Sequence, residues 1–247
     1  MEEKLKKQIV FRPSLVKAMI QISSTLLKAV KDELDELNFF PVPDKDTGKN
    51  AFLVLEGMVK AISEKDYANL TELIDDLLES AQDNARGNIG IAISNGFVGF
   101  FSVLEKEGKS YQEVAPELWQ WIKQVFSEEA DEAKIKIVDG KLLAKALAAG
   151  FDMAYHGFNP PEKKTVLDVM EATKTEASAQ VESGEEDPSV ILEKAIVKAR
   201  KALAETKGKI HKGKTINTED AGAAAFIPIL EAFLQAFAEK KERPDEK

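Results

Sequence analysis

The helical spacing of apolar residues is the feature that most constrains the fold of this chain. In residues 14–37 the apolar side chains lie at Leu15, Met19, Ile22, Leu26, Leu27, Val30, Leu34 and Leu37, which is the pattern of an amphipathic helix. Similar spacing recurs in segments 48–62, 67–82, 91–104, 110–127, 142–155, 166–181, 189–205 and 221–237, and only residues 135–138 alternate briefly like a strand. Eight or nine helices joined by short polar or proline-containing breaks predict an all-α fold.

Composition limits the domain count and the class of protein. The chain has 247 residues, of which 44% are hydrophobic, so we expect one helical domain over residues 1–240 and a polar tail over 241–247. The net charge of −9 argues against a nucleic-acid or anionic-membrane binder, because phosphate backbones need clustered cations. There is no cysteine, which excludes disulfides and thiolate nucleophiles.

The N-terminal residues lack the apolar core of a signal peptide. No uninterrupted apolar run reaches roughly 18 residues, the length that a membrane-spanning helix needs. We therefore expect a cytoplasmic protein without a membrane span.

Residues 38–50 interrupt two long helical patterns and carry the strongest sign of chemistry. Pro41 and Pro43 predict an extended arm, because proline fixes its own φ and restricts the preceding residue. Asp44 and Asp46 are two residues apart, so in extended backbone both carboxylates point to one side and suit Mg²⁺ or Ca²⁺. Thr47-Gly48 then begins a helix whose exposed N–H groups attract phosphate. In the alternative interpretation, Asp46 is an N-cap, Gly48 relieves a turn and Asp44 is solvated.

Residues 83–91 form a second candidate phosphate-binding turn. Gly87 and Gly90 permit close approach of the backbone to a ligand ahead of the apolar helix 91–104. Within that helix, Gly96 and Gly99 predict close helix–helix packing. Before the first helix, Ser14 follows Pro13 and is a possible cap.

The last third of the chain carries a basic stretch in an otherwise acidic protein. Its basic residues are Lys207, Lys209, His211, Lys212 and Lys214. They suit a phosphate clamp, although a solvated flexible loop fits equally well. Asp220 is a candidate N-cap of the final helix, and His156 is expected to be a cation at a helix C-terminus rather than a catalytic group.

Four ordered motifs resemble the ATP-binding domain of bacterial fatty-acid kinases and the nucleotide-binding L subunit of dihydroxyacetone kinase. The first is Asn-Phe-Phe-Pro-Val-Pro-Asp-Lys-Asp-Thr-Gly-Lys-Asn at residues 38–50, and the second is Ala-Arg-Gly-Asn-Ile-Gly at 85–90. Lys-Thr-Val-Leu-Asp at 164–168 and Asp-Ala-Gly-Ala at 220–223 follow in the same order. The resemblance implies an antiparallel helical barrel of about eight helices that holds ATP or ADP and Mg²⁺ at one rim.

The resemblance also implies particular site residues. Asp44, Asp46 and Asn38 would hold the metal ion. The nucleotide would contact Thr47, Gly48, Asn50, Gly87, Asn88, Ile89, Gly90, Lys212 and Asp220. Metal ions and lysines neutralise phosphate charge in such sites, so no protein nucleophile is needed.

We expect a phosphotransferase that uses Mg-ATP, with a fatty acid or a dihydroxyacetone-like acceptor presented by a partner protein. A non-catalytic helical module that works through protein partners is the alternative, and self-association as a homodimer stays open. Lys45 stands where the family has Gly, so its ammonium is expected to compete with the metal or to reach a phosphate. Ile89 replaces a Ser, and Asn38 stands where the L subunits have a third Asp.

Overall fold

The computed structural model describes residues 7–38, 44–110, 133–211 and 213–239, and these parts contain eight helices. The helices are α2 (Pro13–Leu37), α3 (Thr47–Ile62), α4 (Leu70–Asp83), α5 (Gly87–Glu107), α8 (Gly140–His156), α9 (Val166–Glu182), α10 (Pro188–Glu205) and α11 (Ala221–Glu239). The predicted all-α fold is confirmed. The predicted arm at Pro41 and Pro43, the helix 110–127, Lys212 and the tail lie outside the described residues.

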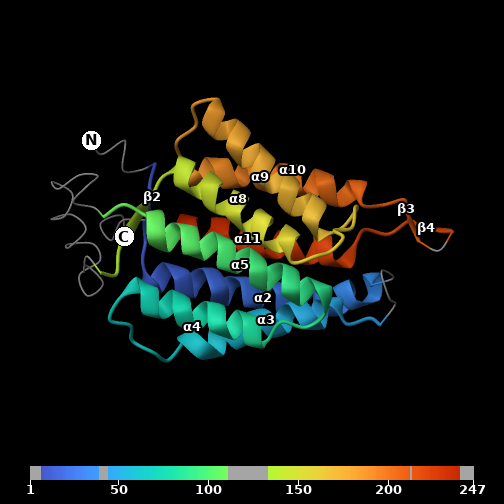
Figure 1. Cartoon of the computed structure of the whole chain (residues 1–247), viewed down its shortest axis with the longest axis horizontal. Helices are drawn as coiled ribbons and strands as arrows, with labels where there is room; N and C mark the ends of the chain where they lie inside the picture. The colour runs from blue at the N-terminus through green and yellow to red at the C-terminus, as the bar shows by residue number, and fades with distance from the viewer. Residues whose placement is uncertain (1–6, 39–43, 111–132, 212, 240–247) are drawn as a thin grey trace.

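The helices form a closed ring. Successive helices pack side by side and run in opposite directions, and α11 closes the ring by packing along α2 (Figure 1). Helices α3, α5, α9 and α11 begin at the end where the β3–β4 hairpin projects, while α2, α4, α8 and α10 end there (Figure 1). The barrel therefore gathers several helix N-termini at one rim, and a helix N-terminus carries partial positive charge.

Short strands supplement the helices. Strand β1 (Ile9–Phe11) pairs antiparallel with β2 (Lys136–Val138), and β3 (Lys209–His211) pairs with β4 (Lys214–Ile216). The brief alternation at residues 135–138 thus did predict a strand. The basic stretch is a hairpin in its described part, which argues against the alternative of a flexible loop.

Helix starts differ from the sequence prediction at two places. Pro13 takes the first position of α2 with Arg12 as N-cap, so Ser14 is not the cap, because proline is pre-organised for that position. Asn69 caps α4 by accepting a hydrogen bond from the Glu72 N–H, so this helix begins at Leu70 and not at Tyr67.

Two core helices contain long, mainly apolar stretches. Gly87–Glu107 and Ala221–Ala238 are long and apolar enough to cross a membrane by composition, although 61% and 56% of those stretches are buried inside the barrel. Phe100 of α5 packs against Phe233 of α11 with ring centroids 5.3 Å apart. Polar residues interrupt the apolar run in both segments, and their burial is that of core helices.

Close backbone contact between α5 and α8 confirms the packing role predicted for glycine in α5. A Cβ atom on Gly99 would lie 2.8 Å from the Gly150 N and even closer to the Ala149 carbonyl oxygen. A Cβ on Gly96 would lie 3.0 Å from the Met170 Cε. The first contact is with fixed backbone and the second with the end of a flexible side chain, so only Gly99 is required sterically.

Candidate functional site

A cavity of about 260 Å³ opens at the rim where the helices begin. Its lining consists of Asn38, Asp44, Asp46, Thr47, Asn50, Gly87, Asn88, Ile89, Phe158, Glu162, Thr165, Val166, Leu167, Asp220 and Gly222. The sequence motifs that lie far apart along the chain therefore do meet at one place, as predicted. Its size is near the lower end of the range of small-molecule sites.

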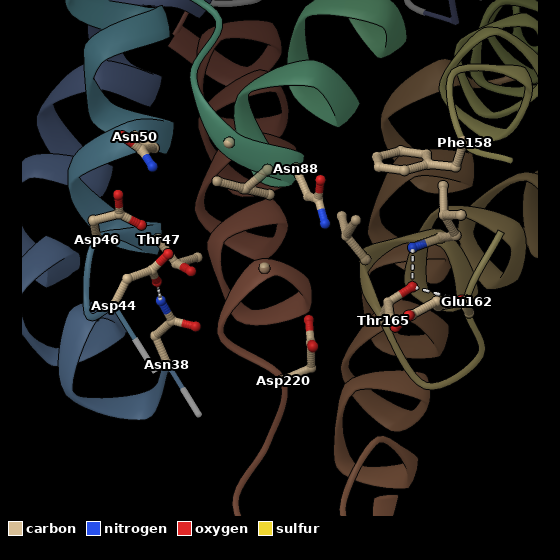
Figure 2. A pocket seen from close by; sticks show the side chains of 15 residues that line it. Asn38, Asp44, Asp46, Thr47, Asn50, Asn88, Phe158, Glu162, Thr165 and Asp220 are labelled. Atoms are coloured by element: carbon tan, nitrogen blue, oxygen red, sulfur yellow. Dashed lines mark hydrogen bonds between the residues drawn. The ribbon is translucent and has the colours of Figure 1, made fainter. Parts of the chain in front are cut away.

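One side of the cavity is polar, and the other combines apolar side chains with Glu162 and Thr165. Asn38, Asp44 and Asp46 lie at one side in Figure 2, and Phe158 lies at the opposite side near Glu162. Ile89, Val166 and Leu167 add apolar surface, and all three are buried. A ligand with one charged end and one flat apolar end matches this division.

The two aspartates of the polar side differ in their contacts. Asn38 Nδ2 donates a hydrogen bond to Asp44 Oδ1 at 2.6 Å (Figure 2). Asp46 occupies the N-cap position of α3, yet its side chain accepts no capping hydrogen bond. Asn38 therefore positions Asp44, and its own carbonyl oxygen is the atom left for a metal ion.

Asp35 caps α3 in place of Asp46. Its Oδ1 accepts hydrogen bonds from the N–H groups of Gly48 at 2.7 Å and Lys49 at 3.1 Å. The alternative interpretation correctly places Asp46 at the N-cap position and Asp44 in solvent, but the Asp46 side chain makes no capping hydrogen bond. Because Asp35 is 13 residues from Gly48, only the packing of α2 against α3 reveals its role.

The residues present fit a magnesium ion that is shared with a ligand. In the described part of the chain no group of three or more His, Cys, Asp and Glu side chains is arranged to hold a metal by itself. Mg²⁺ commonly binds through one or two carboxylates plus phosphate oxygens and water rather than in an all-protein cage. Asp44 and Asp46 supply that carboxylate pair.

Helix N-termini around the cavity differ in how they are capped. Thr165 and Asp168 form a capping box at α9, and Asp220 Oδ1 accepts a hydrogen bond from the Ala223 N–H at 2.8 Å in α11. The N-cap of α5 is Arg86, which makes no side-chain capping hydrogen bond. The first N–H groups of α5 are therefore the ones open to an anion.

Gly87 shapes this open terminus. Its φ of +59° is a conformation that glycine adopts without steric cost, and a Cβ there would approach the buried Asn50 Nδ2 to 3.0 Å. Asn88 and Ile89 follow it along the cavity wall. Ile89, where the family has Ser, packs toward Gly222, since a Cβ on Gly222 would lie 3.5 Å from Ile89 Cδ1.

Two of the predicted nucleotide contacts that the structure describes, Gly48 and Gly90, are not on the cavity wall. Gly48 faces α2, where a Cβ would strike the Lys31 carbonyl oxygen, and its N–H is taken by Asp35. Gly90 donates its N–H to the Arg86 carbonyl oxygen at 3.1 Å and packs against Ala85. Lys212 lies outside the described residues.

The sequence prediction did not single out Phe158 and Glu162 of the α8–α9 loop, or Lys209 beside them. Phe158, Glu162 and Thr165 line the cavity, and only the motif at residues 164–168 pointed toward this loop. Lys209 Nζ lies 3.4 Å from Glu162 Oε2, and its side chain is 12% exposed. Strand alternation in a hairpin, which turns one lysine inward, could have singled it out.

Burial shifts the pKa of two groups beside the cavity. Burial raises the pKa of Asp220, against the opposing effects of the Ala223 N–H and Lys209. Burial lowers the pKa of Lys209, although Asp220, Glu162 and Asp168 favour its charged form. Each group thus relies on the other for part of its charge stabilisation.

Lys45 forms an ion pair with Glu36 at 2.7 Å. Its φ of +54° explains why the resembling family has glycine here. We expect Lys45→Gly to keep the affinity for Mg-nucleotide within about twofold and the free energy of unfolding within about 1 kcal/mol, since relief of backbone strain offsets added chain entropy. Calorimetric titration and thermal melting measure both. A tenfold loss of affinity would show that Lys45 acts at the site.

The fold and the site define a helical-barrel domain with a ligand cavity at the rim where its helices begin. The chain belongs to the DAK2 domain family, whose family model matches residues 41–235. A crystal structure of the dihydroxyacetone kinase from C. freundii, in complex with AMP-PNP and Mg²⁺, is similar in fold with a TM-score of 0.56 and 16% sequence identity. The similarity covers 90% of this chain and 34% of that one.

Relatives by sequence come from Staphylococcus aureus. An uncharacterized protein of strain bovine RF122 / ET3-1 is 29% identical over 212 residues, and one of strain USA300 is 28% identical over 212 residues. Each match covers 85% of this chain and 33% of the relative. The chain thus spans about a third of the length of the curated relatives it matches.

Proposed function

We propose that this protein binds ATP and ADP with Mg²⁺ and serves as the nucleotide-handling domain of a phosphotransferase. The observation that carries the proposal is the two-sided cavity, in which Asp44 and Asp46 face an apolar wall formed by Phe158 and its neighbours. A nucleotide has the same division between phosphates and base. The similar fold of a dihydroxyacetone kinase crystallised with AMP-PNP and Mg²⁺ supports the choice of ligand.

Charge makes the divalent ion a requirement of this proposal. The charged residues that line the cavity are Asp44, Asp46, Glu162 and Asp220, all of them carboxylates. A nucleoside triphosphate is itself a polyanion and would be repelled at close range. Mg²⁺ held by Asp44 and Asp46 would bridge and neutralise the phosphates, while the open N–H groups of α5 would bind phosphate oxygens.

The phosphoryl acceptor would come from another protein or domain. The cavity of about 260 Å³ is small, so a bound nucleotide would leave little room beside it for an acceptor. A fatty acid or a dihydroxyacetone-like compound presented by a partner fits the family resemblance. Transfer would need no protein nucleophile, because the metal and the hydrogen-bond donors would stabilise the phosphoryl group during its transfer.

Calorimetric titration of ATP and ADP, with Mg²⁺ and with EDTA, tests the proposal. We expect micromolar binding in Mg²⁺ and at least about 100-fold weaker binding in EDTA, because only the metal neutralises the carboxylates and phosphates together. Equal binding in both conditions contradicts the assigned metal site, and no binding in either removes the kinase proposal. Tight binding without transfer to any acceptor, even with a partner present, would favour the non-catalytic module.

A further inference from the structure

Two residues other than glycine have a positive φ in the described part of the chain, and both flank the cavity. Lys45, with a φ of +54°, follows Asp44. Lys164, with a φ of +59°, precedes Thr165, and Asp44 and Thr165 both line the cavity. This left-handed conformation is strained for a residue with a side chain, and such strain is common at ligand sites. Lys164 is therefore a candidate for a role at the cavity.

The turn at residues 162–165 places two side chains at the cavity and one outside it. Thr165 Oγ1 donates a hydrogen bond to the Glu162 carbonyl oxygen at 2.9 Å, which closes the turn. Glu162 and Thr165 both line the cavity. Lys164 instead lines a separate groove formed by residues of α9 and α10, so its ammonium is not on the cavity wall.

Lys164 reaches the base of the β3–β4 hairpin. Its Nζ donates a hydrogen bond to the Lys207 carbonyl oxygen at 2.9 Å, and the two residues are 43 positions apart in the chain. Lys207 precedes Gly208, whose N–H donates to the Ile216 carbonyl oxygen at 2.8 Å across the hairpin. Because the acceptor is a main-chain atom, the hydrogen bond from Lys164 fixes the hairpin backbone relative to the α8–α9 loop.

The hairpin and the α8–α9 loop are otherwise anchored on different helices. Thr206, at the base of the hairpin, is 2% exposed and accepts a hydrogen bond from the Asp220 N–H at 2.9 Å, next to α11. The loop leads into the capping box of α9. Glu162 and Lys209 also join the two segments, but their separation of 3.4 Å exceeds the roughly 2.7–2.9 Å of a good charge-assisted hydrogen bond. The hydrogen bond of Lys164 is thus the shorter of these two links.

We propose that Lys164 is a positioning residue of the nucleotide site, whose hydrogen bond to the hairpin keeps the cavity wall formed by Phe158, Glu162 and Thr165 in place. This wall lies opposite the two aspartates (Figure 2). Without the hydrogen bond, the nucleotide would have to order the wall as it binds, and that ordering lowers affinity. The inference rests on the proposed function and adds to it the residue that fixes this wall.

The test begins with calorimetric titration of Mg-ATP and Mg-ADP into wild type, Lys164→Met, Lys164→Gly and Lys164→Arg. Lys164→Met should lower both affinities about 10-fold, the free energy of one hydrogen bond with a charged donor, because the same wall serves both nucleotides. Lys164→Gly should lose as much although glycine adopts the positive φ without strain, which separates the lost hydrogen bond from any loss of stability. Lys164→Arg should bind within about threefold of wild type, since a guanidinium also donates to a carbonyl oxygen.

Amide hydrogen exchange of the nucleotide-free protein measures the link between loop and hairpin directly. The Gly208 N–H is protected by the Ile216 carbonyl oxygen. It should exchange about 10-fold faster in Lys164→Met and Lys164→Gly, because local opening becomes easier by the free energy of the lost hydrogen bond. Lys164→Arg should exchange at nearly the wild-type rate.

Lys163→Met is the matched control. Lys163 is exposed in the same turn, and within the described residues it makes no hydrogen bond or ion pair. Its replacement should change neither affinity nor exchange, and thermal melts verify that every variant is folded. Unchanged nucleotide affinity in Lys164→Met, with or without faster exchange of Gly208, would refute this role of Lys164 while the proposed function stands. Absence of nucleotide binding to wild type would refute the proposed function itself.

Discussion

Replacing Asp46 by Asn is expected to lower the affinity for Mg-ATP by more than about 100-fold, because a neutral amide is a poor ligand for Mg²⁺ and the site has few others. The carboxylate of Asp46 makes no capping hydrogen bond in α3, and Asp35 caps that helix instead. The variant should therefore fold normally. Calorimetry with Mg²⁺ measures the affinity, and a thermal melt within about 2 °C of wild type, the shift expected for a surface substitution, verifies the fold.

Asp75→Asn provides the control for a lost carboxylate. Asp75 is exposed on α4, carries the same charge and lies outside the cavity lining. We expect its affinity for Mg-ATP to match that of wild type. If Asp46→Asn and Asp75→Asn bound Mg-ATP equally well, the metal would have to lie elsewhere. Residues 44–46 would then have only a structural role.

The second large effect is expected from Gly99→Ala, which should lower the free energy of unfolding by about 3 kcal/mol or more. The new methyl group would meet the backbone of Ala149 and Gly150, so α5 and α8 would have to move apart. For a chain of this length that loss corresponds to a fall in Tm of about 6–12 °C. Chemical and thermal denaturation measure it.

Gly96→Ala is the matched control in the same helix. Both substitutions gain the same helix propensity of about 1 kcal/mol, so that contribution cancels in the comparison. At Gly96 the new methyl would lie 3.0 Å from the Met170 Cε and at an ordinary contact distance of 3.9 Å from the Gly150 carbonyl oxygen, and a methionine end can rotate away. We expect stability within about 1 kcal/mol of wild type. If Gly99→Ala were as stable as wild type, α5 and α8 could not be in backbone contact at Gly99.

The sequence predicted the helices well because their apolar periodicity is local. Helix α2 was expected at 14–37 and spans Pro13–Leu37, and the helix expected at 166–181 spans Val166–Glu182. The errors lie at the helix starts, because a single residue at the N-terminus decides where a helix begins. Asn69 moved the start of α4, and Pro13 rather than Ser14 set the start of α2.

The motifs predicted much of the cavity lining because each of them places its polar residues within a few positions of the chain. Asp44, Asp46, Asn88 and Asp220 were expected at one rim and do line one cavity. Their binding to metal and nucleotide stays a prediction. Phe158 and Glu162 could not be found in the same way, since a phenylalanine and a glutamate in a loop carry no local signal of their own.

By itself, the sequence determined the helical class, the order of the turns along the chain and the types of residue in those turns, since these depend on local spacing. Tertiary structure alone decided which side chains have a partner within the protein and which are open to a ligand. Asp35 caps α3 and leaves Asp46 open, Lys45 turns toward Glu36, and Lys209 turns toward Glu162. The physical reason is that a side chain's partner is set by which helices pack together, and distance along the chain does not encode that packing.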